Sequence, residues 1–140
     1  MREYKFRGRR LDNKNWVYGY AIKVGYEHQR YYIADERDET KLRRLAAKTV
    51  DIRCVEVDPR TIGQYVGKIN GEKVYKDDIA KITQACGEET IGTVVWDEEH
   101  LYYALDIGYE LWDFGNIVEC EHEIEVLGNI WDNPKLLEGR

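Results

Sequence analysis

Apolar and aromatic residues alternate with smaller or polar residues along the first 34 positions, and this period of two predicts β-strands. Tyr4 and Phe6 share one face of a first strand, and turn formers follow at 12–15. A second strand carries large apolar residues on one face, namely Trp16, Tyr18, Tyr20 and Ile22. We expect a three-stranded antiparallel meander over residues 1–34, with these aromatic side chains in its core.

The period changes to that of a helix between positions 35 and 49. Leu42, Leu45 and Ala46 fall on one helical face, and Asp38 is a suitable N-cap. We therefore expect a short helix near residues 39–48. The apolar positions of 50–57 then change face once, which predicts a strand with a bulge. The boundary between two subdomains is placed here, at about residue 56.

Turn formers separate short β-prone segments from Val57 onward. Asp58-Pro59 predicts a change of direction, with the aspartate side chain capping the turn that follows. Asn70-Gly71 predicts a type I′ hairpin of strands 64–69 and 72–76, because both residues tolerate positive φ. Further short strands are expected over 79–83, 90–97 and 101–105, the spacing of a small closed barrel. We expect most of four aromatic residues to fill its core, namely Tyr65, Tyr75, Trp96 and Trp112.

A period-2 run near the end of the chain alternates glutamates with apolar or small residues and predicts a strand with one acidic face. The face consists of Glu119, Glu121, Glu123 and Glu125. Like charges two residues apart repel one another, so we interpret the face as a docking surface for a basic protein partner or as a deterrent to edge pairing. An ordinary solvated face is the alternative.

The formal net charge of −6 is unevenly distributed. Residues 1–60 hold 15 Lys and Arg against 10 Asp and Glu, a net charge of +5, whereas residues 61–140 hold 6 against 17, a net charge of −11. The basic part offers an alternative function, nucleic-acid binding, with phosphate contacts from Arg7, Arg9, Arg10, Arg43 and Arg44. The acidic part weighs against it because it repels a polyanion.

The stretch from Val57 to Gly67, with Asn70-Gly71 and 74–79 behind it, resembles the signature of the YopX family of bacteriophage and prophage proteins. Further matches lie at 92–97, 111–112 and 126–130. The resemblance implies a cytoplasmic protein of a bacterial host, with no established activity and a C-terminal part similar to SH3-like small barrels. Asp77 stands where the family has a glycine of positive φ, which aspartate tolerates at modest cost.

The predicted fold is therefore mainly β. An N-terminal antiparallel meander with one short helix (1–56) packs against a small SH3-like barrel (57–134), and 135–140 form a tail. A chain of 140 residues buries roughly two-thirds of its unfolded surface, so a core is feasible without disulfide staples. Three cysteines without C-x-x-C spacing, and no apolar run near the roughly 20 residues of a membrane span, predict a reduced protein outside the membrane.

Candidate catalytic and metal-binding groups do not form a recognised constellation. Cys120 and His122, with Cys86 and His100 elsewhere, lack a second ligand pair at metal-site spacing, so a core cysteine is the better interpretation. The chain has neither a phosphate-binding glycine loop nor carboxylates that sequence places in one cleft. We expect no cofactor and no enzymatic activity. The sequence predicts a non-catalytic interaction module that binds a host or phage protein and forms homo-oligomers.

Overall fold

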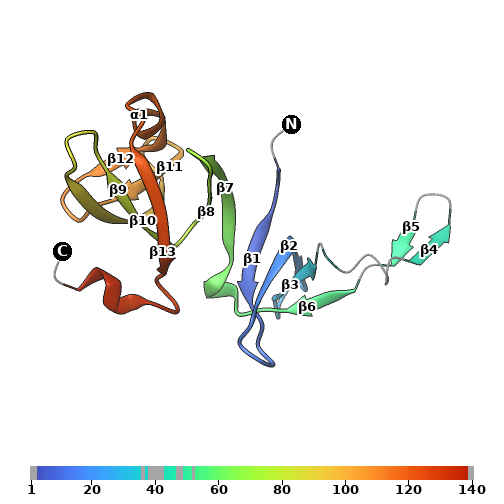
Figure 1. The fold of residues 1–140 in the computed structure, drawn as a ribbon. Coiled ribbons are helices and arrows are strands. Elements are labelled where there is room, and N and C mark those ends of the chain that lie inside the picture. The colour runs from blue at the N-terminus through green and yellow to red at the C-terminus, as the bar shows by residue number, and fades with distance from the viewer. Residues whose placement is uncertain (1–2, 36, 38–42, 47–48, 52, 139–140) are drawn as a thin grey trace. The chain divides into compact units, whose positions relative to one another are not determined.

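The computed structural model describes residues 3–35, 37, 43–46, 49–51 and 53–138. The chain divides into two compact units, Met1–Gln64 and Tyr65–Arg140, called here the first and second unit. Both are built mainly of antiparallel strands, as predicted (Figure 1). The proposed boundary near residue 56 stays a prediction, and the division between the units falls inside strand β7 (Gly63–Ile69).

The first unit is an antiparallel sheet in the order β6-β3-β2-β1, with the start of β7 beside β1. Its strands are β1 (Phe6–Arg9), β2 (Trp16–Val24), β3 (Arg30–Asp35) and β6 (Cys54–Glu56). The predicted meander is thus confirmed in β1, β2 and β3.

The core of the first unit lies on the opposite face of β2 from the one predicted. Val17, Ile33 and Val57 are buried there, whereas Tyr20 is 63% exposed. The reason is the small residue on the neighbouring strand: a Cβ on Gly8 would lie 3.0 Å from Ile33 Cδ1. Little space remains on this face of the sheet, so it is covered by the compact aliphatic side chains of Val17, Ile33 and Val57. The side chains of Trp16, Tyr18, Tyr20 and Ile22 lie on the opposite face of β2.

The turn that ends the first unit clamps the end of β1. The Asp58 carboxylate accepts a hydrogen bond from the Arg60 backbone N–H at 3.0 Å and caps a 3₁₀ turn, Pro59–Thr61, which confirms the predicted capping. Thr61 Oγ1 accepts a hydrogen bond from the Arg9 backbone N–H at 2.8 Å. The Asp58 N–H donates to the Arg9 carbonyl at 2.9 Å. The local turn sequence therefore satisfies backbone groups of strand β1, which lies 52 residues before Thr61 in the chain at Arg9.

The helix expected near residues 39–48 is wrong where the structure describes it. Arg43–Ala46 form strand β4, which pairs with β5 (Thr49–Asp51). Residues 38–42 and 47–48 lie outside the described residues. Helices shorter than about 12–15 residues are marginal without tertiary packing, so the helical period of this short segment did not decide its structure.

The single strand expected over 50–57 is also wrong, because β5 and β6 pair with different strands.

The second unit contains a five-stranded antiparallel sheet in the order β12-β11-β10-β9-β13, and the β7–β8 hairpin. The strands are β8 (Glu72–Tyr75), β9 (Asp78–Thr83), β10 (Glu89–Asp97), β11 (Tyr102–Asp106), β12 (Leu111–Asp113) and β13 (Glu123–Asn129). Helix α1 (Phe114–Glu119) follows β12, and a 3₁₀ turn, Pro134–Leu137, follows β13.

The predicted closed barrel is wrong for the second unit. Over residues 65–138, which are all described, β12 and β13 lie at opposite ends of the sheet order and do not pair. Strand β12 has only three residues, and Asp113 at its end caps α1. The chain therefore enters a helix at the position where a barrel would need a longer strand to close.

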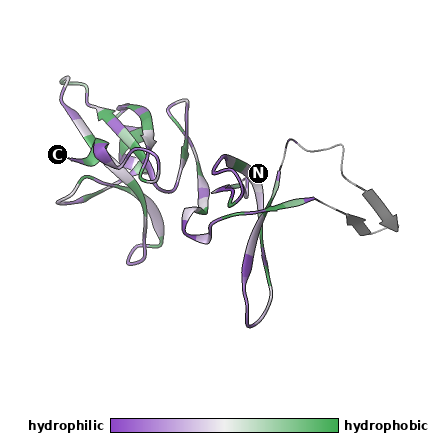
Figure 2. Cartoon of the chain, turned by 90° about the horizontal axis from the view of Figure 1, so that it is seen from below, coloured by the Kyte–Doolittle hydropathy of each residue, from purple (hydrophilic) through white to green (hydrophobic). Residues whose placement is uncertain are grey.

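The core of the second unit combines the sheet with α1. Its buried side chains are Val74, Ala80, Ile82, Val94, Leu105, Ile107, Phe114 and Ile117. Hydrophobic and hydrophilic residues alternate along the strands of this unit in Figure 2. Of the four aromatic residues expected in the core, Tyr75 is buried, Tyr65 and Trp112 are half-buried, and Trp96 is exposed. No helix among the described residues has the length and apolar character to span a membrane.

Two local backbone predictions are confirmed in the second unit. Asn70 and Gly71 take φ values of 46° and 91°, and they join β7 to β8. Asp77 takes a φ of 71° at the position predicted to need a left-handed conformation. Its backbone N–H donates to Val94 O at 2.9 Å and its carboxylate accepts from Trp131 Nε1 at 3.3 Å. These bonds offset the cost of the left-handed backbone.

The left-handed backbone conformation of Leu101 is strained for a residue with a Cβ atom. Leu101 has a φ of 59° and is 72% exposed in the turn between β10 and β11. We expect Leu101→Gly to raise the thermal unfolding midpoint by about 2–5 °C, because glycine adopts this conformation without steric strain. Scanning calorimetry checks the shift. The same replacement at Leu136, in the 3₁₀ turn after β13 and without a positive φ, is expected to lower the midpoint.

Candidate functional site

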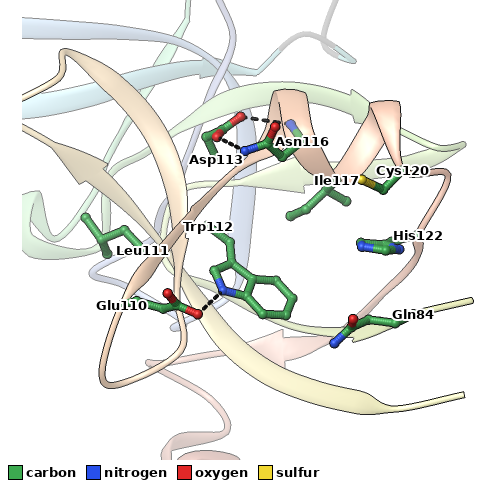
Figure 3. Close-up of a pocket in the computed structure, with 9 residues that line it drawn as sticks. All are labelled: Gln84, Glu110, Leu111, Trp112, Asp113, Asn116, Ile117, Cys120 and His122. Atoms are coloured by element: carbon green, nitrogen blue, oxygen red, sulfur yellow. Dashed lines mark hydrogen bonds between the residues drawn. The ribbon is translucent and has the colours of Figure 1, made fainter. Parts of the chain in front are cut away.

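A cavity of about 330 Å³ opens in the second unit beside β12 and α1 (Figure 3). Residues from four parts of the chain line it: Gln84 after β9, residues 110–113 around β12, Asn116 and Ile117 of α1, and Cys120 and His122 after α1. This size is at the lower end of the range for small-ligand sites, about 300–1,000 Å³. The cavity is therefore suited to a small group or one side chain.

The cap of α1 builds one wall of the cavity. Asp113 Oδ1 accepts a hydrogen bond from the Asn116 backbone N–H at 2.8 Å, and Asp113 Oδ2 accepts from Asn116 Nδ2 at 2.6 Å. The helix ends after six residues, and the His122 N–H donates to the Ile117 carbonyl at 3.1 Å. Glu121 takes a φ of 54° in this reversal. Because the chain reverses direction so tightly after α1, both Cys120 and His122 line the cavity.

The indole of Trp112 forms an apolar wall of the cavity, as Figure 3 shows. Trp112 is half-buried and packs against the core of the second unit. Its Nε1 donates to Glu110 Oε1 at 2.7 Å. The only polar atom of the indole is thus already paired, which leaves the ring face to make apolar or cation–π contacts.

Cys120 and His122 contribute polarisable and polar groups to the same cavity. Cys120 is exposed, so its interpretation as a core cysteine is wrong; the end of α1 at this residue turns it outward. The Nδ1 atom of His122 is buried without a hydrogen-bond partner. Over the described residues, no group of three or more His, Cys, Asp or Glu side chains is arranged to hold a metal ion. The lining offers binding groups of mixed polarity.

The four predicted acidic residues are all exposed, but they do not share one strand face. Glu119 ends α1, Glu121 lies in the reversal after it, and only Glu123 and Glu125 belong to β13. The expected strand from Glu119 is wrong because the Asp113 cap and two buried side chains, Phe114 and Ile117, favour a helix there. Glu119 and Glu121 flank Cys120 in the chain, which places negative charge next to the cavity residues.

Glu125 has a partner within the sheet. Lys81 Nζ lies 3.4 Å from Glu89 Oε1 and 3.4 Å from Glu125 Oε2. The charge of Glu89 is the largest influence that raises the pKa of Lys81, followed by the hydrogen bond with Glu125. Glu125 is therefore the least suited of the four glutamates to attract a basic partner.

The arginines proposed as phosphate contacts are not brought together as one exposed patch among the described residues. Arg7 is only 6% exposed, with its guanidinium carbon 5.0 Å from the Trp16 ring centroid, and Arg9 lies 5.3 Å from the same ring. Arg10 pairs with Asp12 at 2.7 Å. The side chains of Arg43 and Arg44 lie outside the described residues. Nucleic-acid binding stays a prediction.

Sequence reasoning missed an ion pair at the turn between β10 and β11. The buried carboxylate of Asp97 accepts a hydrogen bond from the Glu99 backbone N–H at 3.0 Å, and its Oδ2 lies 2.7 Å from His100 Nδ1. The hydrogen bond with Asp97, and then its charge, raise the pKa of His100 above 6.5. The hydrogen bond with His100 lowers the pKa of Asp97 below 3.8. The sequence signal that could have predicted this ion pair is an aspartate at the start of a hairpin turn, three residues before a histidine.

The pair predicts a pH-dependent contribution to stability. The raised pKa of His100 means that its contribution is complete below about pH 6.5 and is lost as the pH rises through the raised value. The lowered pKa of Asp97 means that its contribution is complete above about pH 4 and is lost on acidification. We expect NMR titration to give a His100 midpoint above 6.5, and Asp97→Asn to lower it. Asp12→Asn is the matched control, and an unchanged midpoint in Asp97→Asn would contradict the pairing.

Comparison with known proteins identifies one family. The family model described as YopX protein matches residues 5–138. No curated protein matches the chain. The matched range contains the capped turn at Asp58, the hairpin at Asn70-Gly71 and the whole cavity beside α1.

Proposed function

We propose that this chain, which belongs to the YopX protein family, is a non-catalytic interaction module that binds a host or phage protein through the cavity beside α1. The observation that supports this function is the combination of an indole wall with a mixed polar lining in one small hollow. Hot spots of protein interfaces are enriched in tryptophan and lie in such hollows. A partner side chain that enters the cavity would meet a wall held in place by its bond to Glu110.

Charge supports a basic partner. Residues 61–140 carry a net charge of −11, and exposed Glu119, Glu121 and Glu123 lie next to the cavity residues in the chain or begin β13. Charges at the rim of an interface mainly increase the association rate and make it depend on salt. We therefore assign Glu119, Glu121 and Glu123 to attracting the partner and the cavity to holding it, and Glu125, which pairs with Lys81, contributes least of the four glutamates.

Capture of partners from infected or lysogenic bacterial cells tests this function. The bait proteins are the wild type, a variant with Gln at Glu119, Glu121, Glu123 and Glu125, and a control with Gln at Glu88, Glu98, Glu99 and Glu138, which are also exposed. Both variants lose four negative charges, so only the position of the charge differs. We expect a protein that the wild type and the control retain and that the first variant loses at least about tenfold, most clearly at low salt.

Retention of no protein above background, or equal retention by both variants, would contradict the proposal. Binding of duplex or single-stranded nucleic acid that weakens steeply with salt would instead favour the basic N-terminal part. Self-association stays a prediction, and sedimentation equilibrium of the purified chain checks it.

A further inference from the structure

Two carboxylates line the cavity without a cationic partner from the described chain. Glu110 accepts a hydrogen bond from the Trp112 indole, and Asp113 accepts two from Asn116. All these donors are neutral. Within residues 3–35, 37, 43–46, 49–51 and 53–138, no Lys or Arg nitrogen forms an ion pair with either carboxylate. The cavity therefore holds two negative charges that its neighbours orient but do not neutralise.

The rest of the lining suits a cation on an apolar stem. The ring face of Trp112 is an electron-rich surface that attracts a guanidinium, and planar guanidinium groups also stack on such rings. Ile117 provides aliphatic contacts for methylene groups. An acidic surface alone would attract any cation, whereas this combination favours a flat cation carried on a hydrocarbon chain.

We infer that the cavity is a receptor for one arginine side chain of a basic partner segment. This inference rests on the proposed function and names the chemistry of its partner. The guanidinium stacks on Trp112 and donates hydrogen bonds to the Glu110 carboxylate beside the ring, Asp113 adds electrostatic attraction, and Ile117 contacts its methylene groups. Arginine fits better than lysine because its five fixed donors serve several acceptors at once and because its planar group matches the indole.

Blocked tripeptides provide the direct test. The probes are N-acetyl-Gly-Arg-Gly-amide and the same peptide with citrulline, which has a similar shape and no charge. Titration of the full chain is followed by NMR at the indole N–H signals of Trp112 and of the other tryptophans. We expect the arginine peptide to move the Trp112 signal and to bind at least about tenfold more tightly than the citrulline peptide. Equal affinity of the two peptides, or a shift at another tryptophan but not at Trp112, would overturn the assignment.

Two isosteric variants locate the charge. Glu110→Gln and Asp113→Asn each remove one negative charge, and asparagine still caps α1, so the helix is retained. We expect each variant to weaken arginine binding about three- to tenfold and the double variant to bind arginine and citrulline equally. Glu138→Gln, which changes an exposed glutamate at the end of the 3₁₀ turn Pro134–Leu137 and outside the cavity lining, is the control. Undiminished arginine selectivity in the double variant would contradict the inference.

The results also separate this inference from the proposed function. Capture of a partner that depends on Glu119 and its acidic neighbours, combined with no arginine binding at Trp112, leaves the interaction module in place and rejects the arginine receptor. Arginine binding at Trp112 without capture of any protein supports the cavity assignment and rejects the proposed function.

Discussion

Leu105→Ala lowers the free energy of unfolding of the second unit by about 2–5 kcal/mol, the range for truncating a fully buried leucine. Leu105 in β11 is 0% exposed and belongs to the core that joins the sheet to α1. Gly92 on the adjacent strand β10 leaves little space, since a Cβ there would lie 2.6 Å from Leu105 Cγ. A side chain held this tightly leaves a cavity that the backbone cannot easily fill. Urea unfolding at constant m-value measures the loss.

A double-mutant cycle sharpens this prediction. Gly92→Ala alone is expected to cost about 1–3 kcal/mol, because the new methyl group meets Leu105 and also Asp106 O. In the Leu105→Ala background part of this overlap disappears, so the second replacement should cost less. Leu101→Ala, at a position 72% exposed, is the control and should change stability by less than about 0.5 kcal/mol. Additive costs of Leu105→Ala and Gly92→Ala would contradict the close packing.

Asp78→Ala is expected to cost about 2–3 kcal/mol of unfolding free energy, because it leaves a buried backbone donor without its acceptor. Asp78 is 2% exposed, and its Oδ2 accepts the Tyr75 backbone N–H at 2.7 Å in the turn between β8 and β9. Asp78→Asn keeps a carbonyl oxygen of the same shape and should cost less. Chemical denaturation gives the free energies, and hydrogen exchange of the Tyr75 amide should accelerate in Asp78→Ala.

Exposed Asp12 provides the control for this prediction. Its carboxylate bonds Arg10 at the surface of the first unit, so Asp12→Ala removes the same group without leaving a buried donor. We expect a change of at most about 1 kcal/mol. If Asp78→Ala and Asp12→Ala were equally mild, the turn hydrogen bond would not contribute to stability as inferred.

Short-range features of the fold were predictable from neighbouring residues. The hairpin at Asn70-Gly71 and the Asp58 cap follow from backbone preferences of two or three adjacent positions, whereas the left-handed Asp77 was expected only from the family resemblance. Such preferences hold in most contexts because they come from local steric and hydrogen-bonding limits. The mainly β character followed in the same way from the period-2 segments.

The candidate site was only partly predictable. The glutamates next to the cavity were found through their regular spacing, although Glu119 and Glu121 lie outside the strand that this spacing predicted. The cavity itself joins Gln84 with residues 110–122, and this approach depends on the pairing of β9, β10, β11 and β12. No local pattern contains that information.

Residue order alone was enough to establish a β-rich chain of the YopX family, the positions of its tight turns and the contrast between a basic beginning and an acidic remainder. Three-dimensional packing was needed to choose which face of β2 is buried, to end the sheet at β12 without closure, and to hold Trp112, Glu110 and His122 around one cavity. The physical reason is the sequence distance over which each feature is determined. Turn conformations depend on a few adjacent residues, whereas a buried face or a cavity depends on the volume and charge of side chains that only long-range strand pairing brings into contact.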